Sequence, residues 1–114
     1  MEEMTERNYL GEFELMIMLA VIHLSDGAYG VPVSRELEKY RGRDVSVSSV
    51  YATLERLEGK GLISSRLGEA TQERGGRAKR YFQVTKAGFR VIRETRRVLT
   101  TLCRRLPELE GESA

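Results

Sequence analysis

Residues 44–65 read DVSVSSVYATLERLEGKGLISS, a helix pattern followed directly by a strand pattern. Its apolar residues recur three and four positions apart, the spacing that buries one face of an α-helix: they are Val47, Val50, Leu54 and Leu57. Asp44 or Ser46 can cap the start of this helix, and Gly61 is a stop signal at its end. The run from 62 to 67 follows at once and predicts a β-strand. A helix that leads directly into a strand is therefore the centre of the fold.

Two more helices are predicted upstream. Apolar residues cover almost every face of residues 11–24, which is typical of a helix buried on more than one side, and residues 25–27 (SDG) end it. Residues 31–40 predict a second helix, because Pro32 is tolerated in a first turn and Gly42 breaks the pattern afterwards. Since only a short break precedes the third helix, the second and third helices are expected to form a helix-turn-helix.

A hairpin and a long helix are predicted downstream. Residues 80–85 alternate in character and predict a second strand. The connection 68–79 (GEATQERGGRAK) is longer than the roughly two to five residues of a usual hairpin loop, so we expect a functional protrusion, or wing. Thr85 can cap a helix from Lys86 to about Leu106, which Pro107 ends. The fold class is mainly α with a small β-hairpin (α+β): a winged helix-turn-helix with a C-terminal dimerisation helix.

The chain has 114 residues, 40% of them hydrophobic and 32% charged, which is typical of one globular domain. We expect an N-terminal arm at 1–10, a winged helix-turn-helix domain at 11–85, and a C-terminal dimerisation helix and tail at 86–114. The net charge of +2 conceals an uneven distribution, because residues 66–97 carry 10 Lys/Arg against 3 Asp/Glu. This asymmetry favours a localised basic surface facing a polyanion, with an ordinary solvated face as the alternative.

The third helix has short polar side chains on the face opposite its apolar stripe. A helix that enters the DNA major groove, about 12 Å wide, needs small polar groups toward the base edges and longer ones toward the phosphates. We therefore predict DNA contacts from Ser46, Ser48, Ser49, Tyr51, Thr53 and Arg56. The alternative is a solvated helix surface.

The loop motif ERGGRAKR places cations around two glycines, so that the backbone can approach phosphates while the cations neutralise them. The predicted wing contacts are Arg74, Gly75, Gly76, Arg77 and Lys79. RNA-binding segments repeat the RGG triplet many times, whereas this chain has it once, so a wing is favoured over an RNA-binding segment. A plain turn is the remaining alternative.

Three stretches resemble the PadR family of winged-helix transcriptional regulators: Tyr29-Gly30, SSVYATLERLEGKGLISS at 48–65, and GGRAKRYFQVTKAG at 75–88. The resemblance runs from about Leu10 to Gly88. Two details differ from the family pattern, Val31-Pro32-Val33 after the Tyr-Gly pair and Ala52 where a proline is common. The single C-terminal helix is similar to the shorter branch of the family.

The resemblance implies a homodimer that represses promoters at inverted repeats, with a small aromatic or drug-like ligand as a further partner. It also implies that Tyr51 and the basic wing at Arg77 and Lys79 approach double-stranded DNA, and that the last helix crosses to the partner subunit. An apolar cavity for a ligand would be lined by Phe13, Met16, Ile17 or Met18, although a filled core is the simpler interpretation.

The dimer also has support from the residues themselves, because the first and last helices carry more apolar surface than one small domain can cover. The predicted interface residues are Phe13, Met16, Ile17, Ile92, Leu99, Leu102 and Leu106. Leu99 and Leu106 continue the seven-residue spacing that begins at Ile92.

An enzyme is not expected, because the chain has one histidine, one cysteine, no metal-ligand spacing and no nucleotide-binding fingerprint. His23 is interpreted as a hydrogen-bonded structural residue and Cys103 as a small packing residue. No cofactor is expected.

With one cysteine, no signal segment and no apolar run long enough to span a bilayer, we expect a cytoplasmic protein without a membrane partner. A winged helix that docks protein, or a ligand sensor whose DNA contacts are secondary, is the competing function.

Overall fold

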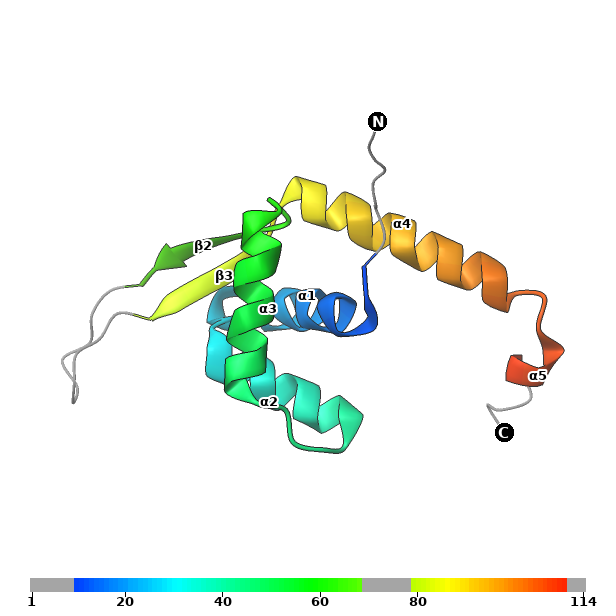
Figure 1. The fold of residues 1–114 in the computed structure, drawn as a ribbon, viewed down its shortest axis with the longest axis horizontal. Coiled ribbons are helices and arrows are strands. Elements are labelled where there is room, and N and C mark those ends of the chain that lie inside the picture. Colours follow the sequence, from blue (N-terminus) through cyan, green and yellow to red (C-terminus); the bar gives the residue numbers. More distant parts are fainter. Residues whose placement is uncertain (1–9, 69–78, 111–114) are drawn as a thin grey trace.

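The computed structural model describes residues 10–68 and 79–110. Figure 1 shows the first three helices, the two-stranded sheet, and the long helix that follows the sheet. The elements in chain order are α1 (Glu12–Leu24), η1 (Ser25–Gly27), α2 (Gly30–Arg41), α3 (Val47–Gly59), β2 (Ile63–Leu67), β3 (Arg80–Val84), α4 (Lys86–Cys103) and α5 (Pro107–Glu110). This order confirms the predicted fold class, a mainly helical chain with a small hairpin.

One hydrophobic core joins the first three helices to the hairpin. Its fully buried side chains come from α1, α2, α3, β2 and β3: Ile17, Met18, Val33, Val50, Leu54, Leu57 and Ile63, with Phe82 at 2% exposure. Phe82 also donates its backbone N–H to the carbonyl of Ala28 at 2.8 Å, so the segment just before α2 lies beside β3. This contact fixes the entry to the helix-turn-helix against the hairpin.

The turn between α2 and α3 closes around Val45. The buried hydroxyl of Ser34 donates to the Val45 carbonyl at 2.7 Å, and the Glu38 carboxylate accepts the Val45 N–H at 3.0 Å. The Val45 side chain itself is buried in the core. Both backbone groups of the turn residue are thereby satisfied by α2, which sets the position from which α3 begins.

The end of α3 is a Schellman motif that redirects the chain into β2. Gly61 has a φ of +78°, a left-handed conformation that glycine adopts without steric cost. Its N–H donates to the Glu58 carbonyl at 2.9 Å, while the Leu62 N–H donates to the Leu57 carbonyl at 3.0 Å. The predicted stop at Gly61 is confirmed, with the last helical residue at Gly59.

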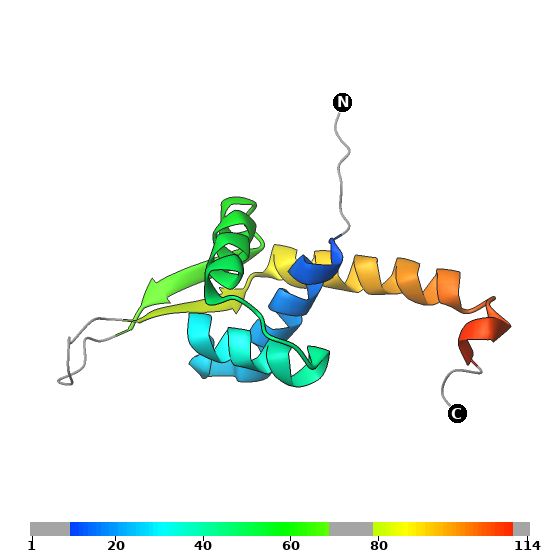
Figure 2. The same cartoon turned by 60° about the horizontal axis from the view of Figure 1, so that its bottom comes forward.

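The hairpin pairs β2 with β3 in antiparallel register, from Ile63 opposite Val84 to Leu67 opposite Arg80. Figure 2 shows the two strands extending away from the helices on the side opposite the far end of α4. One face of the hairpin contributes Phe82 to the core. The opposite face carries Arg66 and Tyr81, which are cross-strand partners.

The first turn of α4 packs tightly against the start of the hairpin. Thr85 caps the helix by accepting the Gly88 N–H at 3.0 Å and donates its own hydroxyl to the Gly61 carbonyl at 2.8 Å. A Cβ at Gly88 would lie 2.2 Å from the Leu62 carbonyl oxygen. The predicted cap is confirmed, and position 88 leaves no room for a side chain.

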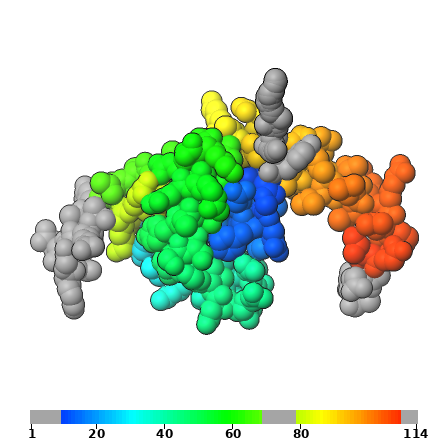
Figure 3. Space-filling view, in the orientation of Figure 1, coloured from blue at the N-terminus to red at the C-terminus, as the bar shows by residue number. Residues whose placement is uncertain are grey.

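The predicted end of the last helix was wrong by one turn. We expected α4 to reach about Leu106, but it ends at Cys103, and Pro107 begins the short helix α5 instead of only ending α4. The reason is that proline fits the first position of a helix, where its missing N–H is not needed. Figure 3 shows the distal part of α4 and α5, in orange and red, standing clear of the helical body.

Candidate nucleic-acid interface

The N-terminal turn of α3 presents a row of short, exposed side chains. Ser46, Ser48, Ser49 and Ala52 are all exposed. Ser46 is the helix cap: its hydroxyl oxygen accepts the Ser49 N–H at 3.3 Å and lies 2.9 Å from the Ser48 hydroxyl. The Ser49 hydroxyl has no protein partner in the described part of the chain. This turn can approach another surface closely and offers a hydroxyl that can both donate and accept.

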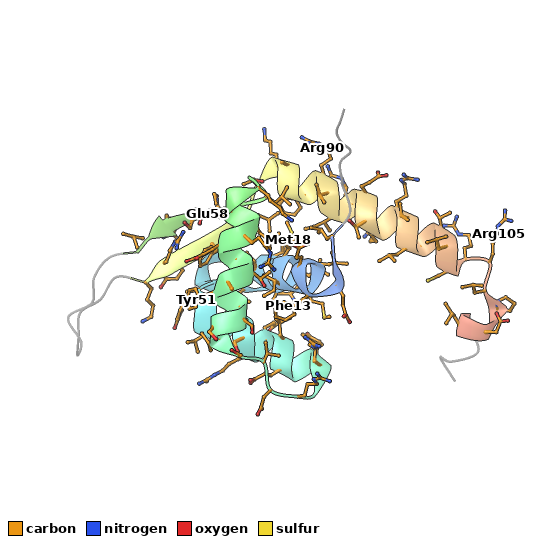
Figure 4. The ribbon with its side chains drawn as sticks, viewed as in Figure 1. Phe13, Met18, Tyr51, Glu58, Arg90 and Arg105 are labelled. Atoms are coloured by element: carbon orange, nitrogen blue, oxygen red, sulfur yellow. The ribbon has the colours of Figure 1, made fainter. Side chains whose placement is uncertain are left out.

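Tyr51 is half-buried and connects three elements. Its ring lies 6.4 Å from the Phe82 ring, measured between centroids, at an interplanar angle of 62°. The same ring packs on the backbone of Gly30 at the start of α2, where a Cβ would lie 2.3 Å from the tyrosine Cε2. The first turn of α3 is therefore locked against both α2 and β3 (Figure 4).

The placement of Thr53 on the open face of α3 was wrong, because its side chain is only 3% exposed. Its hydroxyl accepts a hydrogen bond from the Arg56 guanidinium at 3.3 Å. The helical period explains the burial, since Thr53 lies three residues after Val50 and four before Leu57 on the core-facing stripe. A buried hydroxyl in this position cannot reach a base edge.

Arg56 is exposed, but its guanidinium forms an ion pair with α1. Its Nε lies 3.8 Å from the Glu14 carboxylate, which also accepts a hydrogen bond from Lys60 at 3.3 Å. Burial alone would raise the pKa of Glu14, but the Gly11 N–H, Lys60 and Arg56 outweigh it and hold the pKa below its usual value. The sequence offered no signal for this contact between α1 and α3, because the partners are 42 residues or more apart.

The cations of the hairpin divide into two kinds. Arg80 is tied to α3, where its guanidinium contacts Glu58 and lies 3.6 Å from Glu55, so it is not available as a wing cation. Lys79 is exposed and lies over the Tyr29 ring, 5.1 Å from its centroid. The predicted wing residues Arg74, Gly75, Gly76 and Arg77 lie outside the described residues.

Among the described residues of this stretch, 66–68 and 79–97, the positive charge does not form one surface, contrary to the interpretation from the sequence. Most of it lies on α4, as Lys86, Arg90, Arg93, Arg96 and Arg97. Figure 4 places Arg90 on the outer side of α4, well away from Tyr51 on the lower half of α3. The basic residues of the hairpin and those of α4 therefore face different surroundings.

The predicted dimer residues also divide into two groups. Ile17 and Ile92 belong to the core of the single chain, so their assignment to an interface was wrong. Phe13 and Met16 are half-buried, whereas Leu99 is 49%, Leu102 64% and Leu106 43% exposed. Met16 and Leu99 line an apolar groove of about 590 Å³ between α1 and α4, together with Leu10, Glu12, Leu15, Thr95 and Val98.

The remaining candidate residues are not gathered into a reactive site. His23 lies 3.1 Å from the Glu36 carboxylate, as expected for a hydrogen-bonded structural residue. Cys103 is exposed, so its interpretation as a packing residue does not hold within one chain. Within residues 10–68 and 79–110, no group of three or more His, Cys, Asp or Glu side chains could hold a metal ion. Over those same ranges, every helix is too short or too polar to cross a membrane.

Comparison with known proteins decides the family. Residues 18–94 match the profile of the Transcriptional regulator PadR-like family. The chain belongs to the PadR-like family of transcriptional regulators. It is 36% identical over 94 residues to Transcriptional regulator Rv3488 of Mycobacterium tuberculosis, covering 80% of this chain and 79% of that protein. The expectation that the chain is not an enzyme is confirmed by this membership.

Solved PadR structures share the fold. A PadR family transcriptional regulator from Eggerthella lenta is 27% identical, with a TM-score of 0.64 over 86% of this chain and 85% of that one. A PadR-like transcriptional regulator from Bacillus cereus, at 23% identity, has a TM-score of 0.68 over 85% of this chain and 89% of that one.

Two parts of the PadR scaffold were not identified from the sequence. Ser34 and Glu38, which hold the turn before α3, were not singled out, although a serine three residues before Leu37 lies next to the buried stripe of α2. Gly30, which accommodates the Tyr51 ring, was noted only as part of the Tyr-Gly pair. Such a close approach between two elements leaves no periodic signal in the sequence.

Proposed function

We propose that this PadR-like protein is a homodimeric repressor that binds an inverted-repeat operator through the first turns of its two α3 helices. The observation that carries the proposal is the exposed row Ser46, Ser48, Ser49 and Ala52, which is backed by the locked Tyr51. Small polar side chains at the N-terminal end of a recognition helix are what a major-groove contact requires.

The side chains of α3 would have different roles in DNA binding. Ser46 already caps the helix, so its main contribution is to fix the first turn. The Ser49 hydroxyl, which has no partner among residues 10–68 and 79–110, would contact a base edge, and Ala52 offers a methyl group that suits contact with thymine. Arg56 would need to leave Glu14 to reach a phosphate, so we assign it a flanking role at most.

The wing would contact the DNA backbone beside this groove. Lys79 is exposed directly before β3, and the predicted contacts at Arg74, Gly75, Gly76 and Arg77 precede it in the chain. Cations at these positions would neutralise phosphates irrespective of base sequence. Affinity should therefore depend steeply on salt, while the preference for one sequence should depend on α3.

A second copy of the chain would cover the apolar side of α4. Leu99 and Leu102 are exposed on α4, whose distal part stands clear of the body (Figure 3), and Leu106 is exposed just after this helix. Burying such side chains against a partner removes apolar area from water, which favours association. The two α3 helices of the dimer would then meet successive major grooves, about 34 Å apart, on an inverted repeat.

The groove between α1 and α4 is also where a small ligand would act. Its lining is apolar except for Glu12 and Thr95. A second copy of the chain packed on α4 would cover the open side of this groove. A small aromatic or drug-like molecule bound there would change the angle between α4 and the body, and with it the spacing of the two α3 helices. We propose release from DNA by such a ligand on this basis.

Binding to DNA is the direct test of this function. Fluorescence anisotropy would compare the duplex upstream of the protein's own gene with a scrambled duplex, at about 50 and about 200 mM salt. We expect tight, salt-sensitive binding with a clear preference for the native duplex. Equal weak binding to both, together with no motif from a genome-wide selection, would contradict the proposal and favour a winged helix that docks protein.

A further inference from the structure

Two tyrosine rings pack together near the loop end of the paired strands. Tyr29 directly precedes α2, Tyr81 lies on β3, and their ring centroids are 5.4 Å apart at an interplanar angle of 68°. Both residues are half-buried. The hydrogen bond from the Phe82 N–H to the Ala28 carbonyl holds the two backbones side by side, so this edge-to-face pair has a fixed place.

Each ring carries one cation. The Arg66 guanidinium lies 5.0 Å from the Tyr81 centroid, and the Lys79 ammonium lies 5.1 Å from the Tyr29 centroid. Arg66 is the cross-strand partner of Tyr81, so it is held on the same face of the hairpin. We call these four residues the tyrosine platform.

The two cations are oriented but not neutralised. Among residues 10–68 and 79–110, neither Arg66 nor Lys79 forms an ion pair with a carboxylate, and both are exposed. Arg80, the neighbour of Lys79, is instead paired with Glu55 and Glu58. An aromatic ring attracts a cation without cancelling its charge, and a guanidinium lying over a ring keeps its edge N–H groups free to donate.

The platform is joined to α3 through the start of α2. Tyr51 on α3 packs on Gly30, and Gly30 follows Tyr29 directly in the chain. The start of α2 therefore links α3 to the loop end of the paired strands, the end that extends outward in Figures 1 and 2. A duplex seated on the first turn of α3 would bring its phosphate backbone toward this end of the hairpin.

We propose that the tyrosine platform is a phosphate contact, in which Tyr29 and Tyr81 position Lys79 and Arg66 against the DNA backbone beside the groove that α3 enters. The inference rests on the proposed DNA binding and deepens it. Arg66 becomes a DNA-contacting residue, and the two tyrosines become positioning residues. A guanidinium with a free edge can donate two parallel hydrogen bonds to the two oxygens of one phosphate. A phosphodiester therefore matches this donor geometry better than a single carbonyl oxygen does.

The test measures anisotropy with a duplex of random sequence, because a phosphate contact does not depend on the operator. Arg66→Ala is compared with the wild type between about 50 and about 200 mM salt, and Arg90→Ala on the outer side of α4 is the matched control. We expect Arg66→Ala to reduce the slope of log affinity against log salt by about one, the loss of one neutralised phosphate, and Arg90→Ala to leave it unchanged.

A second pair of variants tests the positioning by the ring. Tyr81→Leu keeps both cations but removes the ring, and we expect an affinity at least about threefold weaker at low salt, because Arg66 is no longer held in place. Tyr81→Phe keeps the ring and should bind like the wild type. Unfolding midpoints equal to that of the wild type would show that all variants are folded.

The outcomes distinguish the inference from the function on which it rests. A wild-type protein that binds no DNA overturns both. A wild type that binds DNA, with Arg66→Ala identical in affinity and slope, overturns the platform and leaves the proposed function standing. Tyr81→Phe as weak as Tyr81→Leu would show that the phenol hydroxyl, not the ring, is what matters, and would also overturn it.

Discussion

The Tyr51 ring rests directly on the backbone of Gly30, so closely that a Cβ at position 30 would lie 2.3 Å from two of its ring carbons. The contact joins the N-terminal half of α3 to the first residue of α2. The ring also packs edge-to-face against Phe82, so a displacement of Tyr51 would disturb its contact with the core. The orientation of the predicted recognition helix therefore depends on the absence of a side chain at position 30.

Gly30→Ala should displace Tyr51 and with it the first turn of α3. We expect a loss of about 1–3 kcal/mol in the free energy of unfolding, as for overpacked sites, and at least tenfold weaker operator binding. Urea unfolding and anisotropy measure the two effects. Gly59→Ala is the control, since a Cβ there meets nothing within 4 Å. Wild-type stability and binding in Gly30→Ala would show that the ring is free to move.

Ser34→Ala removes the buried donor that satisfies the Val45 carbonyl. We expect a loss of about 1–3 kcal/mol in the free energy of unfolding, because the carbonyl of the turn is left without its partner. Ser49→Ala, at an exposed hydroxyl with no protein partner in the described part of the chain, should change it by no more than about 0.5 kcal/mol. Equal urea midpoints for the two variants would contradict this account of the turn.

The Glu14 carboxylate should make stability depend on pH in one direction. Its pKa is lowered in the folded protein, so its ionised form stabilises the fold above the usual value of 4.5, and this contribution is lost as the pH falls through the lowered pKa. Glu14→Gln should cost roughly 0.5–1 kcal/mol at neutral pH and nothing in acid. Chemical unfolding across this range measures the difference.

The control for this titration is Glu12→Gln, at an exposed residue two positions earlier. We expect this variant to change the free energy of unfolding by no more than about 0.5 kcal/mol at neutral pH. If Glu14→Gln lost as much stability in acid as at neutral pH, the ion pairs with Lys60 and Arg56 would not be the source of its effect.

Leu99→Glu should weaken the dimer. A charge at this half-exposed apolar position would be placed against the partner, and we expect a shift toward monomer by light scattering together with weaker operator binding. Thr101→Glu introduces the same charge on an exposed residue of the same helix and should leave the dimer intact. A Leu99→Glu protein that stays dimeric would place the interface elsewhere.

Local signals were sufficient to predict the elements of this fold. The stripe Val47, Val50, Leu54 and Leu57, the cap at Thr85 and the stop at Gly61 each depend on residues a few positions apart, and each is present in the structure. The end of α4 was misjudged because proline both stops one helix and starts another. Sequence spacing alone does not separate these two uses.

The candidate site was harder to predict. The predictions that failed concern residues whose contacts come from parts of the chain distant in the sequence. Arg56 and Arg80 look like free cations in the chain, yet Glu14 holds the first, and Glu55 and Glu58 hold the second. Ile17 and Ile92 have the spacing of an interface, but the core of a single chain buries them. Only the folded arrangement reveals which charges remain free and which apolar residues remain exposed.

The most direct measurement is the sequence preference of Ser49→Ala, determined by in vitro selection from a random DNA library beside the wild type and Thr101→Ala. If α3 reads the operator, Ser49→Ala should lose discrimination at one base position of each half-site, worth about 1–3 kcal/mol, while Thr101→Ala selects the wild-type motif. An unchanged motif for Ser49→Ala would contradict the assignment of the α3 serine row as the surface that reads DNA.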